Sequence, residues 1–218
     1  MAEHFREWKA LLDKVDVPAN HIYNIDETKI ELFHVKGPRV LVAKGQKRVE
    51  RQRAGKGLKH ISFMSCVNAA GEALPPTFLF AGKRIVKNIM SPNAPEGSQF
   101  ILTDKGYMDS PAYLSYCKQL LSTIKERPLI LVTDGHKSRD GATLQCAIDD
   151  VHVFQLHSHS THMTQPLDVA VYPVFKKSWS ATFDKFCIEQ PSLRNSVDRS
   201  TVTELIAGMT TVEFIAEW

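Results

Sequence analysis

The apolar run from Leu129 to Val132 constrains the fold more than any other stretch of this sequence. An uninterrupted apolar run behind a proline predicts a short strand that is buried on both faces and therefore lies inside a sheet. The run is followed by Thr133, Asp134 and Gly135. Because functional groups of open α/β sheets collect where the strands end, Asp134 is the first candidate for chemistry. The alternative is an aspartate that only stabilises the turn before Gly135.

Two further aspartates stand at comparable places in the sequence. Asp26 ends a second apolar run, which begins at Ile22, and Asp168 follows Gln165 where a helical pattern begins. The chain between Asp134 and Asp168 is long enough to form a helix, a strand and a loop and to return to the same sheet edge. The three acids therefore belong to three separate elements that can converge at one place.

Four motifs, taken in order over roughly residues 20 to 180, resemble the DDE endonuclease domain of pogo/Tigger-type transposases. Centromere protein B and Jerky-like domesticated proteins share this domain. Each motif alone is weak, and their order and spacing together carry the resemblance. The motifs are Asn24-Ile25-Asp26-Glu27-Thr28, Gly71 with Pro75-Pro76, Asp134-Gly135-His136, and Gln165-Pro166-Leu167-Asp168-Val169.

The resemblance implies an α/β fold of the ribonuclease H-like (retroviral integrase-like) class. Its mixed sheet has an antiparallel meander followed by parallel strands, with helices on both faces. The resemblance also implies that Asp26, Asp134 and Asp168 are the catalytic and metal-binding residues of a DNA strand-cleaving and strand-transfer enzyme. Three adjacent carboxylates repel one another unless cations neutralise them, which favours Mg²⁺ or Mn²⁺. The resemblance implies two such ions per site. One metal would activate water or a 3′ hydroxyl, and the other would stabilise the leaving oxygen.

The sequence departs from the family pattern at two places. Arg139 stands where relatives often have a second histidine, and a histidine-rich segment from His157 to His162 replaces the usual residues before Gln165. These departures leave open a domesticated DNA- or chromatin-binding protein without catalytic turnover. A nuclease of the same fold that acts on RNA-containing substrates is a third alternative.

The histidines 157, 159 and 162 are a second candidate metal site, for zinc or copper. Their spacing is not a common structural zinc pattern, and no cysteine stands near them in the sequence. We therefore favour a position at the border of the active site, where such a side chain contacts phosphate or water.

A basic segment is the candidate DNA-binding region. A single acid, Glu50, interrupts it, and glycines make it flexible enough to follow a phosphate backbone. The alternative is a solvated loop. The net charge of +3 and the pI of about 8.6 are compatible with DNA binding without being diagnostic of it. The basic residues are Lys44, Lys47, Arg48, Arg51, Arg53, Lys56 and Lys59.

The composition of the sequence indicates in which cellular compartment the protein is expected. The hydrophobic fraction of 43% and the charged fraction of 23% are those of an ordinary globular protein. The 4 cysteines form no Cys-x-x-Cys pair, which predicts reduced and mostly buried thiols. No apolar run is long enough to span a bilayer and the N-terminus lacks a signal-peptide pattern, so we expect a cytosolic or nuclear protein without membrane association. The resemblance implies DNA as the partner and therefore the nucleus, with a homodimer as one possible state.

Three segments are expected. Residues 1–20 read as an N-terminal helix or linker, residues 21–190 as the DDE endonuclease catalytic domain, and residues 191–218 as a C-terminal helical extension. Family members carry an upstream helix-turn-helix domain for DNA recognition, which does not fit in 20 residues, so we expect it to be absent from this chain.

The expected secondary structure follows apolar periodicity. Strands are predicted at residues 22–26, 39–43, 61–67, 77–80 and 151–156, besides the run at 129–132. Helices are predicted after an Asp109 N-cap with Pro111 in the first turn, at 139–149, from Leu167 onward and near residues 202–209. Pro173 is expected to kink the helix after Leu167 or to delay its start. No assignment is made for residues 82–109.

Overall fold

The computed structural model describes residues 2–32, 44, 60–84, 92–135, 150–157, 160–193 and 197–212. Within these residues the strands form one 6-stranded sheet in the order β4-β3-β2-β1-β5-β6. β1, β2 and β3 pair antiparallel, whereas β1 with β5, β5 with β6, and β3 with β4 pair parallel. The expected meander followed by parallel strands is confirmed. The strands are β1 (Ile22–Glu31), β2 (His60–Asn68), β3 (Ala73–Ala81), β4 (Gln99–Thr103), β5 (Leu129–Thr133) and β6 (Val151–Gln155).

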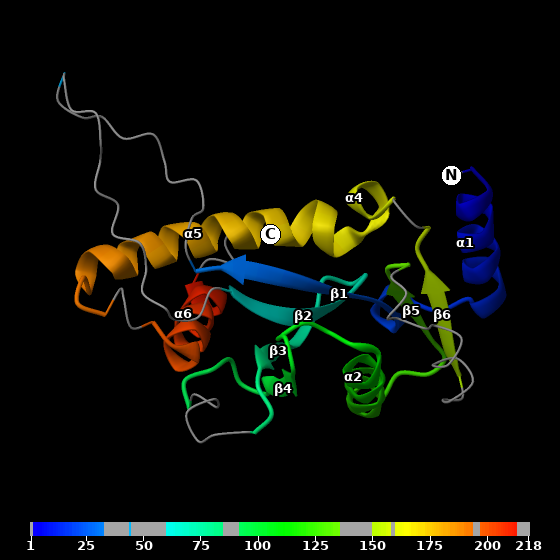
Figure 1. Cartoon of the computed structure of the whole chain (residues 1–218). Helices are drawn as coiled ribbons and strands as arrows, with labels where there is room; N and C mark the ends of the chain where they lie inside the picture. The colour runs from blue at the N-terminus through cyan, green and yellow to red at the C-terminus, as the bar shows by residue number, and fades with distance from the viewer. Residues whose placement is uncertain are drawn as a thin grey trace.

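Helices cover both faces of the sheet (Figure 1). The long helix α5 crosses one face, α2 lies against the opposite face, and α1 stands beside β6 at the edge. No helix in the described part of the chain is long and apolar enough to cross a membrane. The helices are α1 (Ala2–Val15), η1 (Ala19–His21), α2 (Ser110–Thr123), α4 (Thr161–Thr164), the π-helical turn η3 (Leu167–Val171), α5 (Tyr172–Glu189) and α6 (Arg199–Val212).

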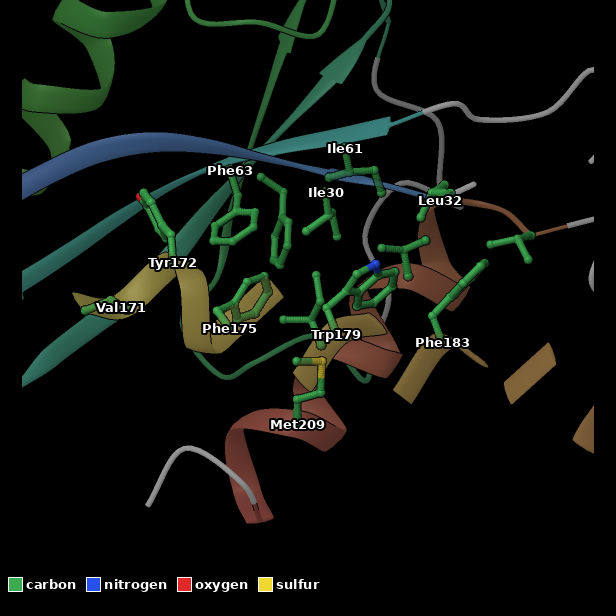
Figure 2. Close-up of a cluster of buried hydrophobic side chains, with 14 of the residues drawn as sticks. Ile30, Leu32, Ile61, Phe63, Val171, Tyr172, Phe175, Trp179, Phe183 and Met209 are labelled. Carbon is green, nitrogen blue, oxygen red and sulfur yellow. The ribbon is translucent and has the colours of Figure 1, made fainter. Parts of the chain in front are cut away.

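An aromatic core joins α5 to the sheet (Figure 2). Phe175 and Trp179 of α5 point toward Ile30 of β1 and Phe63 of β2, and the ring centroids of Phe63 and Phe175 lie 5.1 Å apart. Met209 of α6 packs into the same cluster. The apolar stripe that predicts α5 thus serves to hold this helix, and the turn before it, on one face of the sheet.

A second core lies under α2. Tyr113 and Cys117 pack with Ile25 of β1 and Leu131 of β5. The helix begins as the sequence predicts, because the Asp109 carboxylate accepts a hydrogen bond of 2.9 Å from the Ala112 amide, with a proline in the first turn. Alternate residues of β1 therefore face different helices, which decides where its polar side chains point.

The N-terminal helix α1 packs on the outer strands of the sheet. Trp8 and Leu11 join a small cluster with Ile130 and Val132 of β5, and the Trp8 and Phe154 rings lie 4.8 Å apart. The amphipathic pattern of residues 1–20 is explained by this contact, since its apolar stripe faces the sheet.

Most predicted strands are found, with two differences. β1 extends to Glu31, and β4 lies in the region left without an assignment. β4 is a partly exposed edge strand between loops, so it lacks the alternating pattern of a strand with one buried face. Its Phe100 stacks on Phe78 at 5.7 Å, a contact that depends on tertiary structure. The predicted strand at 39–43 and helix at 139–149 lie outside the described residues.

The cysteines described in the structure agree with reduced thiols. Cys66 and Cys117 are buried, and Cys187 is partly buried. Burial raises the pKa of the Cys66 thiol, which disfavours the reactive thiolate. Cys146 lies outside the described residues.

Candidate active site at the carboxyl end of β5

Asp26 lies in the central strand on the face that α5 covers. Its neighbour Ile25 packs under α2, whereas Ile30 packs under α5, and the alternation of a strand puts Asp26 on the side of Ile30. Asp26 is 4% exposed, and its carboxylate accepts a hydrogen bond of 2.8 Å from the Glu27 amide. Glu27 faces the other side, where its carboxylate accepts from the Met108 amide at 3.3 Å. Glu27 therefore points away from the face on which Asp26 lies.

Asp134 follows β5 directly, at the position in line with Asp26. β1 and β5 run parallel with Asn24 opposite Val132, so two residues further on each chain come Asp26 and Asp134. Asp26 and Asp134 thus lie just beyond the last residues that β1 and β5 pair. Asp134 is partly buried.

Asp168 lies in a π-helical turn at the start of the long helix. The Tyr172 amide donates to the Leu167 carbonyl, five residues back, and α5 begins at Tyr172 with Pro173 in its first turn. Proline has no amide hydrogen, so the first turn of a helix tolerates it. The expected kink or delayed start takes the form of a π-helical turn that runs directly into α5. Single π turns inside helices are frequent at functional sites. Asp168 is exposed.

Two buried carboxamides connect the elements that carry the three aspartates. The Asn24 Nδ2 group donates to Gln165 Oε1 at 2.6 Å and to the Val132 carbonyl at 3.2 Å. Asn24 Oδ1 accepts from the Leu167 amide at 3.2 Å, and Gln165 Nε2 donates to the Ile25 carbonyl at 3.3 Å. Asn24 is 6% exposed and Gln165 is 0% exposed. We call this pair of side chains the carboxamide bridge.

A phenol adds a further connection between β1 and α5. The Tyr172 hydroxyl donates to the backbone carbonyl of Asp26 at 2.8 Å, and Tyr172 is 2% exposed. The Lys176 ammonium lies 5.7 Å from the centre of the Tyr172 ring. The first residue of α5 is thus bonded to the strand position that carries one of the candidate acids.

The carboxylates themselves are not assembled into a metal centre. Across the described ranges, no group of three or more His, Cys, Asp or Glu side chains lies close enough together to hold a metal ion. The structure brings together the backbone segments of Asp26, Asp134 and Asp168, and the donor atoms are the hard oxygens that Mg²⁺ and Mn²⁺ prefer. Metal binding by the three acids stays a prediction.

The other candidate residues are described only in part. Lys44 lies exposed in a turn, and the remaining basic candidates, Lys47, Arg48, Arg51, Arg53, Lys56 and Lys59, lie outside the described residues. His157 is exposed, and its ring meets the His4 ring edge-on at 6.1 Å. His159 and the side chain of His162 lie outside the described residues. Neither the basic segment nor the histidine cluster is tested by the structure.

A pocket of about 380 Å³ opens beside the carboxamide bridge, away from the acids. Its walls are mostly apolar and include Trp8 of α1 and Phe154 of β6, with Asn24 and Pro166 at the other side. None of the three candidate aspartates lines it. The pocket thus borders the place where the acid-bearing segments meet, since Asn24, Val132 and Pro166 line it, but none of the acids does.

The roles of Asn24 and Gln165 were missed by sequence reasoning. Both residues stand in the motifs that carry the family resemblance, but only the charged members of each motif were predicted as site residues. A usable signal was present, since Asn24 stands two residues before Asp26 and Gln165 three residues before Asp168. Buried carboxamides near catalytic acids are candidates for holding those acids in place.

Comparison with known structures identifies the fold. The chain resembles the Mos1 strand transfer complex, with a TM-score of 0.53 and 13% identity over 95% of this chain and 57% of that chain. It also resembles the Mos1 mariner paired end complex with Mn, with a TM-score of 0.51 and 11% identity over 96% of this chain and 58% of that one. Together with the mixed sheet and its helices, this confirms the ribonuclease H-like fold.

Sequence comparison finds a relative and a family. An MFS-type transporter named clz9 from Cochliobolus lunatus is 21% identical over 175 residues, which are 77% of this chain and 19% of that protein. The chain thus spans about a fifth of this relative and less than two thirds of the Mos1 chains. The family model described as DDE superfamily endonuclease matches residues 58–215, a range that includes Asp134 and Asp168 and begins after Asp26. Because that match covers more than half of the sequence, the chain belongs to the DDE superfamily endonucleases.

Proposed function

We propose that the chain is the catalytic domain of a pogo/Tigger-type transposase, which cleaves DNA strands and transfers them to a new site. Asp26, Asp134 and Asp168 supply its carboxylates. The observation that supports this most is the carboxamide bridge, because it ties the three acid-bearing segments together in a chain of the DDE superfamily. The relation to centromere protein B and Jerky-like proteins belongs to the same proposal.

The acids differ in what their surroundings let them do. The Asp26 carboxylate is buried and oriented by the Glu27 amide, which suits a fixed ligand. Asp134 and Asp168 reach solvent more, so DNA and ions have access from their side. Together the three would hold Mg²⁺ or Mn²⁺, two ions per site. When bound, such ions activate an attacking oxygen and stabilise the leaving one in displacement at phosphorus.

DNA is the proposed partner. A DDE endonuclease acts on a polyanion, and the basic segment from Lys44 to Lys59 provides cations for its phosphates. One similar structure is described as a strand transfer complex, which favours the same class of partner here. A DNA substrate in turn makes the nucleus the expected compartment. Homodimer formation is also part of the proposal.

We propose that the catalytic domain comprises residues 21–190. Residues 1–20 then form a helix or linker, and residues 191–218 form a helical extension. Packing argues that the two flanking segments contribute to the same fold. Trp8 of α1 packs on the sheet, and Ile206 of α6 packs into the α5 core.

A second candidate function is a domesticated DNA- or chromatin-binding protein that keeps the fold without turnover. One observation favours it: in the part of the chain that the structure covers, no three acidic or imidazole side chains are grouped as a metal site. Such a protein would bind DNA without responding to divalent ions. The two functions therefore differ in a measurable property.

A nicking assay tests the proposed activity. Purified protein is incubated with supercoiled plasmid and Mn²⁺, and conversion to the open circle is measured on a gel. We expect weak nicking with little sequence preference, and its loss in Asp134→Asn, because a neutral amide is a poorer ligand for a hard dication. Asp184→Asn, which changes an exposed aspartate further along α5, is the matched control and should nick like the wild type. Equal nicking by Asp134→Asn would assign the cleavage to another site, and a wild type that binds plasmid without nicking it would favour the domesticated protein.

A further inference from the structure

We propose that Asn24 and Gln165 are positioning residues, which hold the turn that carries Asp168 at a set place relative to the strands that carry Asp26 and Asp134. This inference rests on the proposed function, because it assigns a task within that site. Neither side chain is proposed to touch substrate or ions. Their action is through the backbone of the segments they join.

The hydrogen bonds of the bridge reach all three segments. Asn24 itself belongs to β1, two residues before Asp26. Its Nδ2 group bonds the Val132 carbonyl, two residues before Asp134. Its Oδ1 atom accepts from the Leu167 amide, next to Asp168. A single side chain thus contacts each segment within two residues of its acid.

Gln165 completes the arrangement from the other side. Its Oε1 atom accepts the 2.6 Å bond from Asn24, and its Nε2 group donates to the Ile25 carbonyl, next to Asp26. Both hydrogens of Asn24 Nδ2 and the acceptor atoms of both amides are used in these contacts. Both side chains are buried, so removal of one leaves polar atoms of the other without the partner they have in the folded protein.

The position of the bridge distinguishes it from ordinary core hydrogen bonds. β5 ends at Thr133, so strand pairing with β1 stops before Asp134. The π turn that carries Asp168 belongs to no strand and is joined to β1 through Leu167 and Gln165. Regular sheet and helix bonds therefore do not set the distance between the acids. The bridge joins the segments where those bonds stop.

A second buried asparagine, Asn68, serves as a control that distinguishes positioning of the acid-bearing segments from stabilisation of the fold. Asn68 lies on the neighbouring strand β2, opposite Tyr23, and is 6% exposed, as Asn24 is. Its side chain also makes several hydrogen bonds, but these join Glu72 and Ala70 of the following turn and the Asn20 carbonyl before β1. Asn68→Ala therefore removes a comparable set of bonds without touching the segments of Asp134 and Asp168.

The experiment measures the thermal midpoint of metal-free protein during titration with Mn²⁺, and the nicking rate over the same concentrations. The variants are Asn24→Ala, Gln165→Met and Asn68→Ala. Gln165→Met keeps the length of the side chain without its hydrogen-bonding atoms, which protects against loss of folding. Removal of residues that orient metal ligands weakens metal affinity by about 10- to 100-fold in known sites. We expect the Mn²⁺ concentration at half-maximal response to rise at least about tenfold in Asn24→Ala and Gln165→Met. Asn68→Ala should respond at the wild-type concentration even if its metal-free midpoint is lower.

In the double variant Asn24→Ala/Gln165→Met, the Mn²⁺ concentration at half-maximal response should be no higher than in the single variant that binds Mn²⁺ more weakly. Both changes break the same hydrogen-bond network, so their effects should not add. Wild-type half-maximal concentrations in Asn24→Ala or Gln165→Met would overturn the inference and leave the bridge as a stabilising core contact. An equal rise in Asn68→Ala would overturn it as well. A wild type that neither nicks DNA nor responds to Mn²⁺ refutes the proposed function itself, and that result is visible before any bridge variant is compared.

Discussion

The Tyr172 hydroxyl offers a one-atom change beside the candidate site. It donates at 2.8 Å to the backbone carbonyl of Asp26, and the residue is 2% exposed. The ring packs edge-on against Phe63, with centroids 6.3 Å apart. Tyr172→Phe removes the hydroxyl and keeps this packing, so its effect reports on the hydrogen bond.

The expected cost follows from burial. A buried acceptor that loses its donor costs about 1–3 kcal/mol, because water does not reach the vacated carbonyl. For a chain of this length each kcal/mol lowers the thermal midpoint by roughly 2–4 °C. We therefore expect Tyr172→Phe to melt roughly 2–12 °C below the wild type, with unchanged far-UV circular dichroism. Since α5 and β1 lose a connection at Asp26, the Mn²⁺ response should weaken as well.

The assay is thermal unfolding of metal-free protein, repeated with millimolar Mn²⁺. Tyr107→Phe is the control, since Tyr107 is 43% exposed and surface changes of this kind stay within about 0.5 kcal/mol. A Tyr172→Phe protein as stable as the wild type would refute the assigned hydrogen bond. A lower midpoint with an unchanged Mn²⁺ response would show that the bond stabilises the fold without orienting Asp26.

Two further outcomes are expected. Deletion of Ala170 from the π turn should convert the turn to regular α-helix and rotate Asp168 by about 100° relative to α5, since an α-helix has 3.6 residues per turn. Helix content by circular dichroism should persist, while the Mn²⁺ response should be lost. A retained Mn²⁺ response would contradict this role of the turn. Replacement of Lys47, Arg48 and Arg51 by alanine should lower the slope of log affinity for duplex DNA against log salt by up to about three units, whereas an unchanged slope would mean that the basic segment is a solvated loop.

Sequence reasoning predicted the elements whose signals are local. The apolar run ending at Val132 is β5, and Asp109 caps α2 as expected. It failed for β4, where Phe100 gains its partners only when β3 lies beside it. Pairing across a sheet depends on residues distant in sequence, and a partly exposed edge strand carries little periodic pattern.

The sequence pointed to three candidate acids, whose role stays a prediction, and gave no sign of the hydrogen bonds that connect their segments. Asp26, Asp134 and Asp168 could be named because each follows a strand signal or precedes a helical one. The contact between Asn24 and Gln165 joins residues 141 positions apart, and no periodicity in either segment predicts it. The sequence did not predict the π turn either, because Pro173 is compatible with a delayed helix start as well as with a kink.

The placement of Asp26 argues that the site is maintained for a purpose other than folding. On the same face of β1, Ile30 and Leu32 pack into the α5 core, whereas Asp26 is a carboxylate with 4% exposure. An apolar side chain at this position would pack as Ile30 and Leu32 do, without the desolvation cost of a buried carboxylate. Local choices that conflict with the fold concentrate at functional sites. The structure around Asp26 also supplies what such a site needs, since the Tyr172 hydroxyl holds its carbonyl and the carboxamide bridge holds the segments beside it.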